Sequence, residues 1–268
     1  MTRATYMKMI GAMLVLTVVQ SVIMLIPDWN GMQGSEEADD IDLLLDVMIV
    51  LSSFVFSIVV VMLGFCLYKY RAKPGDESDG KPIHGNTRLE IAWTVIPTVI
   101  VLFAAAYSWV ILDDIEAEAS ENQMPVNVTA QQFKWTFEYP ETGVVSDEFH
   151  VPVDTQLELS LSALEVLHSF WVPEWRIKRD LVPIADGNPT DVDNVVRVTP
   201  NAEGSYSLIC TEYCGWGHAT MRASVTVESQ EEFDAWMQEQ EAEMTQTSSS
   251  EVADESASGT ESEEVASE

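Results

Sequence analysis

The chain has 268 residues, enough for one well-cored domain with additional segments. It carries 44 acidic and 13 basic side chains, a formal net charge of −31, which argues against a nucleic-acid partner because phosphates would be repelled. Only three cysteines are present, and this excludes a fold stapled by several disulfides.

The negative charge is spread over the polar second half of the chain rather than gathered in one patch. A basic docking protein is one interpretation of this acidity. Salt adaptation is the other, because dense surface carboxylates keep a protein solvated in concentrated salt, where their mutual repulsion is screened. We favour salt adaptation and a halophilic source, such as a halophilic archaeon.

The first of three long apolar runs covers residues 9–26 and follows the basic residues Arg3 and Lys8. Its 18 residues lie at the boundary between the core of a signal peptide and a membrane helix. Residues 1–30 are therefore predicted to be either a signal peptide or a first membrane helix.

The second and third apolar runs, 47–68 and 91–112, contain 22 residues each. Both are long enough to span a bilayer, so residues 42–112 are predicted to form a transmembrane hairpin. The loop between the two spans is basic, with Lys69, Arg71, Lys73, Lys81 and Arg88. Basic loops stay in the cytoplasm, which places everything after residue 112 on the extracellular side of the cell membrane.

Residues 113–228 are predicted to form an external β domain. Short runs of alternating apolar and polar residues predict strands at 126–130, 133–139, 148–151, 156–161, 194–199, 206–209 and 222–228. No helical pattern of useful length separates these runs, so an antiparallel sandwich or barrel is expected rather than a βαβ arrangement.

A short helix is predicted over residues 229–243. Ser229 and Glu232 form a capping box at its start, and Phe233, Trp236 and Met237 give it one apolar face. The Ser/Glu-rich tail, 244–268, has almost nothing to bury and is predicted to be disordered.

Soft and borderline metal donors gather in the segment that follows the strand at 206–209. Cys210 and Cys214 are four residues apart, and His218 and Met221 come next at short spacing. Thiolate and thioether ligands favour copper, whereas zinc sites have little use for a thioether. A disulfide between the two cysteines is the alternative, but the adjacent His and Met, and a further His168 in a strand-like stretch upstream, favour a metal site.

With these residues in place, the segment resembles the binuclear copper A loop of subunit II of haem–copper oxidases, whose pattern is C-x-E-x-C-x-x-x-H-x-x-M. The stretch around His168, with the sequence VLHSFWVP, resembles the family segment that supplies the first copper ligand. The resemblance covers about residues 40–228. It implies a cupredoxin-like domain and a pair of copper ions bound by His168, Cys210, the backbone carbonyl of Glu212, Cys214, His218 and Met221.

The resemblance also implies roles outside the copper ligands. Glu90, in the sequence RLEIAWTVIP, matches a family glutamate at the entrance of a proton pathway into subunit I. The Glu212 side chain corresponds to one that reaches a magnesium or manganese site shared with subunit I. The aromatic residue through which electrons often enter corresponds to Phe133, with Trp135 as the next aromatic; this departure from the usual tryptophan leaves the donor open between cytochrome c and a blue-copper protein.

Four further residues are interpreted from the sequence: three aromatic residues close to the predicted ligands, and one more histidine. Trp216 lies between the ligands, and Phe170 and Trp171 flank His168, so these rings are expected either to shield the site from water or simply to pack in the core. His150 matches no family ligand and is expected to be structural.

The sequence is therefore interpreted as subunit II of a terminal haem–copper oxidase. It would accept electrons from an external donor and pass them to haem in subunit I, where oxygen reduction is coupled to proton pumping. The alternatives are the copper A subunit of a nitric oxide reductase and a copper-delivery protein; a quinol oxidase subunit II would lack the copper ligands.

Overall fold

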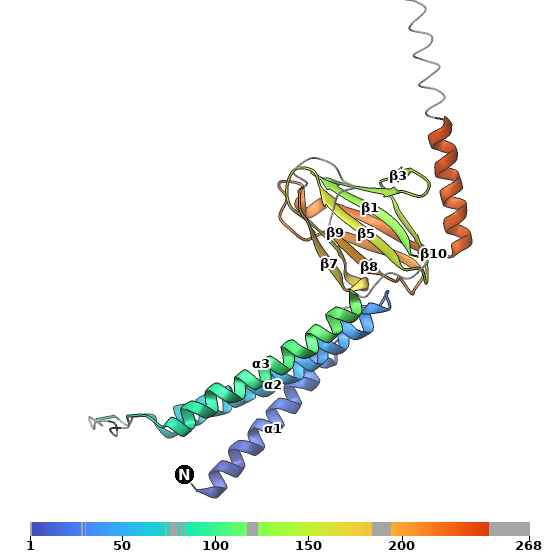
Figure 1. Ribbon diagram of the computed structural model, residues 1–268. Coiled ribbons are helices and arrows are strands. Elements are labelled where there is room, and N and C mark those ends of the chain that lie inside the picture. The colour runs from blue at the N-terminus through green and yellow to red at the C-terminus, as the bar shows by residue number, and fades with distance from the viewer. Residues whose placement is uncertain are drawn as a thin grey trace, which may run out of the picture. The chain divides into compact units, whose positions relative to one another are not determined.

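The computed structural model describes residues 2–27, 29, 31–72, 74–75, 80, 82, 84–116, 123–183 and 194–246. The chain divides into two units (Figure 1). The helical unit is formed by residues 1–29 and 39–115, and the β unit by residues 30–38 and 116–268.

Three long helices make up the helical unit: α1 (Arg3–Leu25), α2 (Glu37–Lys69) and α3 (Thr87–Ile115). Each is long and apolar enough to cross a membrane. Many of their large apolar side chains are exposed, as expected of helices that lie in lipid. The expectation of two or three membrane helices is thus met by three such helices. Two basic residues of the loop between the second and third spans, Lys73 and Lys81, lie outside the described residues.

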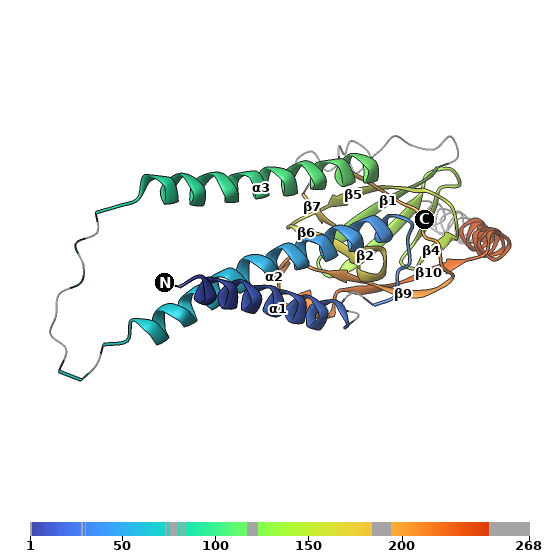
Figure 2. The same ribbon diagram turned by 90° about the horizontal axis from the view of Figure 1, so that it is seen from below.

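Helix α1 lies against α2 within the helical unit (Figure 2). The Ser57 hydroxyl of α2 donates to Gln20 Oε1 of α1 over 2.9 Å and also approaches the Ser53 carbonyl at 2.7 Å. Ser57, Ser53 and Ser21 are all buried. The two apolar helices therefore meet where Gln20 and Ser57 pair, whereas the buried Ser21 hydroxyl has no hydrogen-bond partner among the described residues.

Ten strands form two five-stranded sheets in the described part of the β unit (Figure 1). The first sheet has the order β3 (Val144–Ser146), β2 (Lys134–Tyr139), β1 (Met124–Gln131), β5 (Leu157–Ala163), β8 (Val195–Val198). The second has the order β4 (Phe149–Pro152), β10 (Arg222–Glu228), β9 (Gly204–Cys210), β6 (His168–Val172), β7 (Ile177–Leu181).

The predicted β fold is confirmed, with one correction to the strand directions. Six of the pairings between these strands are antiparallel, but β1 pairs with β5 and β4 pairs with β10 in parallel. Alternation of apolar and polar residues identifies a strand and its buried face but does not encode which strand lies beside it. The parallel pairs were therefore not visible in the sequence.

The core lies between the two sheets. Val126, Val128 and Ala130 of β1 are fully buried, as period-2 alternation requires of a strand with one inward face. Across the core, the Phe137 ring of the first sheet stacks on the Phe149 ring of the second, with centroids 4.5 Å apart. Each such aromatic ring contributes a large apolar area to the core.

Residues 31–38 come directly before and at the start of α2 and pack as part of the β unit. The predicted external domain, 113–228, did not include them. The Gly34 N–H donates to the Glu174 carbonyl, and an isolated bridge joins Ser35 to Pro200. Gly34 is tightly packed, because an added Cβ would lie 3.3 Å from side-chain atoms of both Glu174 and Trp175. We call residues 31–38 the strap. Further hydrogen bonds hold it. The Arg176 guanidinium donates to the Gly31 and Met32 carbonyls, the Ser35 hydroxyl donates to the Trp175 carbonyl, and the Thr199 N–H donates to the Glu37 carboxylate. Backbone bonds from Glu36 to Thr199 and from Asn201 to Gly34 add to these.

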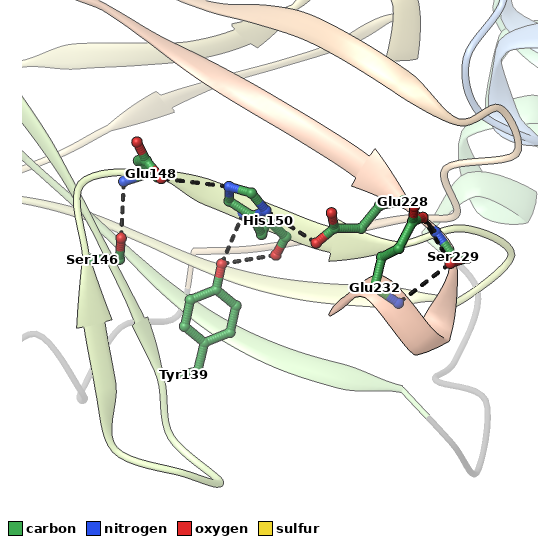
Figure 3. Close-up of polar contacts among 7 residues, drawn as sticks. All are labelled: Tyr139, Ser146, Glu148, His150, Glu228, Ser229 and Glu232. Atoms are coloured by element: carbon green, nitrogen blue, oxygen red, sulfur yellow. Dashed lines mark hydrogen bonds and ion pairs between the residues drawn. The ribbon is translucent and has the colours of Figure 1, made fainter. Parts of the chain in front are cut away.

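A helix over residues 230–246 follows β10. Its capping box forms as predicted, since the Ser229 hydroxyl accepts from the Glu232 N–H and donates to the Glu232 carboxylate over 2.7 Å (Figure 3). Phe233 and Met237 are buried against the sheets. Residues 244–246, which were predicted to belong to the disordered tail, are helical; the tail beyond residue 246 lies outside the described residues.

His150 on β4 is enclosed by this helix and its neighbours (Figure 3). Its Nδ1 lies 3.0 Å from the Glu228 carboxylate and its Nε2 3.6 Å from Glu148. Its ring stacks on Trp236 with centroids 4.3 Å apart, and the Tyr139 hydroxyl donates to its backbone carbonyl. Burial raises the pKa of Tyr139, so this hydroxyl stays protonated. These contacts give His150 a structural position, as expected from the sequence.

Candidate metal centre

Two adjacent strands of the second sheet bring the first donor groups together. β6 begins at His168 and β9 ends at Cys210, and the two strands pair antiparallel with Phe170 opposite Cys210. Antiparallel pairing therefore places the start of one strand beside the end of the other. The Thr211 N–H donates to the Ser169 carbonyl and extends this pairing into the loop.

The loop after β9 folds back on itself and brings the remaining donors to the same point. The short helix η2 (His218–Thr220) and the start of β10 close the loop, and the Cys210 N–H donates to the Met221 carbonyl. The donor distances are 3.7 Å from Cys210 Sγ to His168 Nδ1, 3.3 Å from Cys210 Sγ to the Glu212 carbonyl, 3.8 Å from Cys210 Sγ to Cys214 Sγ, 3.7 Å from Cys214 Sγ to His218 Nδ1 and 3.8 Å from Cys214 Sγ to Met221 Sδ.

All six sequence-predicted ligand groups thus lie around the two sulfurs. His168, Cys210 and Cys214 offer ligand atoms within 4.8 Å of one another. Both cysteines are free thiols, and their 3.8 Å separation is far longer than the roughly 2.0 Å of a disulfide bond. The disulfide alternative is therefore not the arrangement of this structure.

Burial sets the protonation of these groups in the absence of a metal. Burial, with a smaller contribution from neighbouring Cys210, raises the pKa of the Cys214 thiol to about 11. Burial also lowers the pKa of His168, against the opposing effect of the Glu165 carboxylate. The imidazole is therefore neutral with a lone pair available, and a metal must displace a proton from the Cys214 thiol in order to bind.

The ligand loop is held in place by its glycines and by the turn before β2. Gly215 has a φ of +127°, which L side chains rarely adopt. A Cβ at Gly217 would overlap the Phe133 ring, which packs directly on this backbone. The Gln132 side chain donates to the Cys214 carbonyl over 2.5 Å. Sequence reasoning missed Gln132, because 82 residues separate it from Cys214 and no local pattern links them.

The aromatic residues near the site differ in exposure from what the sequence suggested. Phe170 is fully buried, but Trp216 is fully exposed at 101 % and therefore does not shield the centre from water, which corrects the expectation for this residue. A ring on a tight Gly-Trp-Gly turn has no core to pack against. Trp135 is buried with its ring 6.5 Å from His168, whereas Phe133 is 40 % exposed.

Two further predicted residues lie outside the cluster. Glu90 is in the first turn of α3, where its carboxylate accepts from the Asn86 N–H over 3.1 Å. The structure thus gives Glu90 a local helix-capping contact. Glu212 is half-buried, and its backbone carbonyl rather than its carboxylate faces Cys210.

The chemistry of the donor set fits copper. Two thiols and one thioether are soft donors, two imidazoles are borderline, and none of the clustered side chains is a carboxylate. One tetrahedral ion takes four ligands, so six groups exceed what a single such ion requires.

Comparison with known proteins identifies two matching families. "Cytochrome C oxidase subunit II, transmembrane domain" matches residues 29–111, and "Cytochrome C oxidase subunit II, periplasmic domain" matches residues 141–230.

Similar full-length relatives carry related names. Cytochrome c oxidase subunit 2 of Thermostichus vulcanus is 30 % identical over 282 residues, covering 82 % of this chain and 83 % of the relative. The protein of the same name from Synechocystis sp. is 29 % identical, covering 86 % and 83 %. Quinol oxidase subunit 2 of Bacillus cereus is 26 % identical over 205 residues, covering 70 % and 65 %.

Proposed function

The chain belongs to the cytochrome c oxidase subunit II family, and from this premise we propose that its six clustered donor groups bind two copper ions as a copper A centre. As a subunit of this oxidoreductase complex, the chain transfers electrons through its copper domain to subunit I. The observation that carries the two-copper proposal is the pair of free thiols 3.8 Å apart, each with an imidazole nitrogen 3.7 Å away.

The roles of the ligands follow from their positions. Cys210 and Cys214 lie at the middle of the cluster and would bridge both ions as thiolates after losing their protons. His168 and His218 would each bind through Nδ1, and Met221 and the Glu212 carbonyl would complete the set. When bound, the copper ions would supply one-electron redox chemistry. The fixed loop and the burial of Cys210, Cys214 and Met221 keep the donors in place and limit access of water.

A copper count on the full-length chain, purified in detergent, tests this proposal. We expect two coppers per chain and an electron paramagnetic resonance (EPR) spectrum of one electron shared between two equivalent coppers. Cys210→Ser and Cys214→Ser should each abolish this spectrum, whereas Cys66→Ser, at the third cysteine, should leave it unchanged. One copper per chain, or a shared-electron spectrum that survives in either ligand variant, would contradict the proposal.

The electron donor is proposed to be cytochrome c or a blue-copper protein. Phe133, partly exposed beside the ligand loop, is available to contact such a donor. Trp135 is only 2 % exposed, so it would act behind the surface, next to His168, rather than as a contact residue. Reduction rates measured with each class of donor distinguish the two.

Two roles that involve subunit I rest on the family resemblance. Glu90 is proposed to lie at the entrance of a proton pathway, and its position in the first turn of α3, after the basic loop, agrees with a cytoplasmic location. The Glu212 carboxylate is proposed to bind a magnesium or manganese ion shared with subunit I. Loss of proton pumping in Glu90→Gln, and loss of bound manganese in Glu212→Gln, are the corresponding tests.

We propose that α1 is a third membrane helix of the mature subunit rather than a removed signal peptide. The Gln20–Ser57 hydrogen bond ties it to α2, and separating the helices would leave a glutamine and several serines facing lipid. With the basic loop in the cytoplasm, the β unit is extracellular and the start of α1 is cytoplasmic. The N-terminal sequence of the subunit isolated from membranes tests this: a mature chain that begins after residue 26 would contradict it.

The competing functions are less well supported. A copper-delivery protein of the thioredoxin-like class would have helices between its strands, but between β1 and β10 the described residues contain only two three-residue 3₁₀ turns. A quinol oxidase subunit would lack the copper ligands, which are clustered here. The copper A subunit of a nitric oxide reductase has the same donor set, so a neighbouring gene for subunit I is the discriminating observation.

The surface acidity is proposed to reflect salt adaptation. In four ion pairs of the β unit's described residues, one Lys or Arg faces one carboxylate. The whole chain has 44 acidic against 13 basic side chains, so most of its carboxylates have no basic residue to neutralise them, and the net charge is −31. The β unit should therefore lose stability when salt is removed. Thermal unfolding that is unchanged in dilute buffer would refute this proposal.

A further inference from the structure

Gln132, in the turn between β1 and β2, joins the two stretches of chain that carry the proposed copper ligands. Its side-chain amide donates to the Cys214 carbonyl over 2.5 Å, and its backbone N–H donates to the Glu165 carboxylate over 3.2 Å. Cys214 belongs to the ligand loop, whereas Glu165 lies three residues before His168, on the segment that leads into β6. Gln132 therefore contacts both segments that supply the donor groups, although it is not a ligand itself.

The Gln132 amide meets the ligand loop at the peptide bond that follows Cys214. A Cβ added at Gly215 would lie 2.9 Å from Gln132 Nε2, so the amide lies directly against this backbone. Among the described residues, no backbone N–H donates to the Cys214 carbonyl. The Gln132 amide therefore gives this carbonyl the hydrogen bond that the backbone does not provide.

The same turn of the loop carries a second proposed ligand. The His218 N–H donates to the Gly215 carbonyl over 3.1 Å, and His218 Nδ1 lies 3.7 Å from Cys214 Sγ. A shift of the peptide between Cys214 and Gly215 would therefore move a thiol and an imidazole together. Because glycine restricts its own backbone very little, contacts from outside the turn are needed to fix it.

An N–H donor beside a redox centre also acts through its charge. The positive end of the amide dipole favours the state of the centre that holds one more electron, and this effect is strong near a group as buried as Cys214, which is 3 % exposed. Replacing a residue that supports a metal ligand typically lowers metal affinity by about 10- to 100-fold. The Gln132 amide is therefore placed to affect both copper binding and the ease of reduction.

We propose that Gln132 is a positioning residue that sets the copper affinity and the reduction potential of the centre through its hydrogen bond to the Cys214 carbonyl. When the centre accepts one electron from its donor, Gln132 is neither oxidised nor reduced and none of its bonds changes; its amide stabilises the reduced state. This inference rests on the proposed copper centre and adds to it a residue outside the ligand set.

The test uses the full-length chain, purified in detergent and loaded with copper. Gln132→Met nearly keeps the length of the side chain and removes the amide, and Gln132→Glu keeps its shape but turns an acceptor toward the carbonyl. The matched controls are Gln131→Met and Gln131→Glu, at the neighbouring glutamine that ends β1 opposite Lys134. Copper affinity, reduction potential and EPR spectrum are measured for each variant, together with thermal unfolding of the metal-free chain.

Gln132→Met should lower copper affinity by about 10-fold or more. The equilibrium constant for its reduction should fall by at least about threefold, which is about 28 mV for a one-electron couple. Gln132→Glu should lower the potential further, because its negative charge opposes the added electron. Both variants should alter the copper hyperfine splitting of the EPR spectrum. Gln131→Met should match the wild type, and Gln131→Glu should shift the potential less than Gln132→Glu does.

The metal-free Gln132 variants should unfold within about 4 °C of the wild type, the shift expected from losing one hydrogen bond. If Gln132→Met takes up no copper, this measurement decides. Unfolding within that range supports the inference, because the fold is intact and only the arrangement of ligands is lost. A larger fall overturns it, because the chain has then lost its fold.

Other results would overturn the inference even in variants that bind copper. A wild-type potential and EPR spectrum in Gln132→Met would show that the amide does not act on the centre. Equal shifts in the Gln131 and Gln132 variants would show that the hydrogen bond to Cys214 has no role of its own. In both cases the shared-electron spectrum of the wild type would leave the copper centre standing. A wild-type chain without that spectrum would overturn this inference together with the proposed function.

Discussion

Two histidines of the β unit, the half-buried His150 and the buried His168, have opposite surroundings. His150 has a carboxylate near each ring nitrogen and the Trp236 ring stacked on its face. His168 has Nδ1 directed at the Cys210 sulfur, 3.7 Å away, and its buried Nε2 has no hydrogen-bond partner among the described residues. Both ring nitrogens of His150 thus have partners within the fold. His168 belongs to a group of donors that would bind a metal ion.

The largest effect is expected from removing each histidine in turn. His168→Gln should lower copper affinity by more than about 100-fold. Loss of a residue that only supports a metal ligand typically lowers affinity by about 10- to 100-fold, and loss of a ligand itself should cost more. His150→Gln should leave the copper content unchanged but lower the free energy of unfolding by about 1–3 kcal/mol, because the largely buried Glu228 carboxylate loses its partner. Copper titration and denaturant unfolding measure the two effects, and copper loss in His150→Gln would remove the distinction between the two histidines.

A smaller effect is expected from Gly217→Ala, which tests whether the ligand loop depends on the Phe133 ring. The added methyl group would overlap this ring, and overpacking of this kind typically costs about 1–3 kcal/mol. We expect weaker copper binding and an altered EPR spectrum. Phe133→Ala in the same chain should restore the wild-type spectrum by making room for the methyl group.

Gly64→Ala is the matched control for this substitution, since no heavy atom within 4 Å would meet a Cβ at Gly64 in α2. Its copper spectrum should equal that of the wild type. If Gly217→Ala binds copper as the wild type does, the ring and the loop adjust freely, and the fixed backbone inferred for the loop is wrong.

Much of the candidate site could be predicted from the sequence because its ligands are local. Cys210, Cys214, His218 and Met221 lie within twelve residues, so their spacing alone restricts the chemistry. The fifth side chain, His168, was implied by the resemblance of its segment to the family and not by the strand pattern, which is equally typical of a core histidine. The capping box at Ser229 and the limits of β10 are likewise local features.

The features that the sequence did not reveal all depend on distant contacts. Gln132 reaches the carbonyl of Cys214, the strap binds next to Trp175, and β1 pairs in parallel with β5. Trp216 was expected near the copper because of its place in the motif, but side-chain direction depends on the turn geometry around Gly215. Patterns along a chain report local conformation and buried faces; they do not report which far segment completes a contact.

The smallest effect on stability is expected from changes to the helix over residues 230–246, whose Trp236 ring stacks on the His150 ring. Hydrogen bonds from the Ser229 side chain and N–H lower the pKa of Glu232 below its ordinary value of 4.5. A group whose pKa is depressed on folding stabilises the fold above its unfolded pKa, and this contribution is lost as the pH falls through the folded value.

Ser229→Ala should therefore lower helix stability by about 1 kcal/mol at neutral pH, the usual cost of removing a serine cap. Glu232→Gln should differ from the wild type at pH 7, and the difference should vanish as the pH falls well below 4.5. Hydrogen exchange of residues 230–246 measures both effects. Neither variant should change the copper content, because the cap supports the helix beside His150 and not the copper ligands. A pH-independent difference between Glu232→Gln and the wild type would show that the carboxylate does not stabilise the helix through its charge.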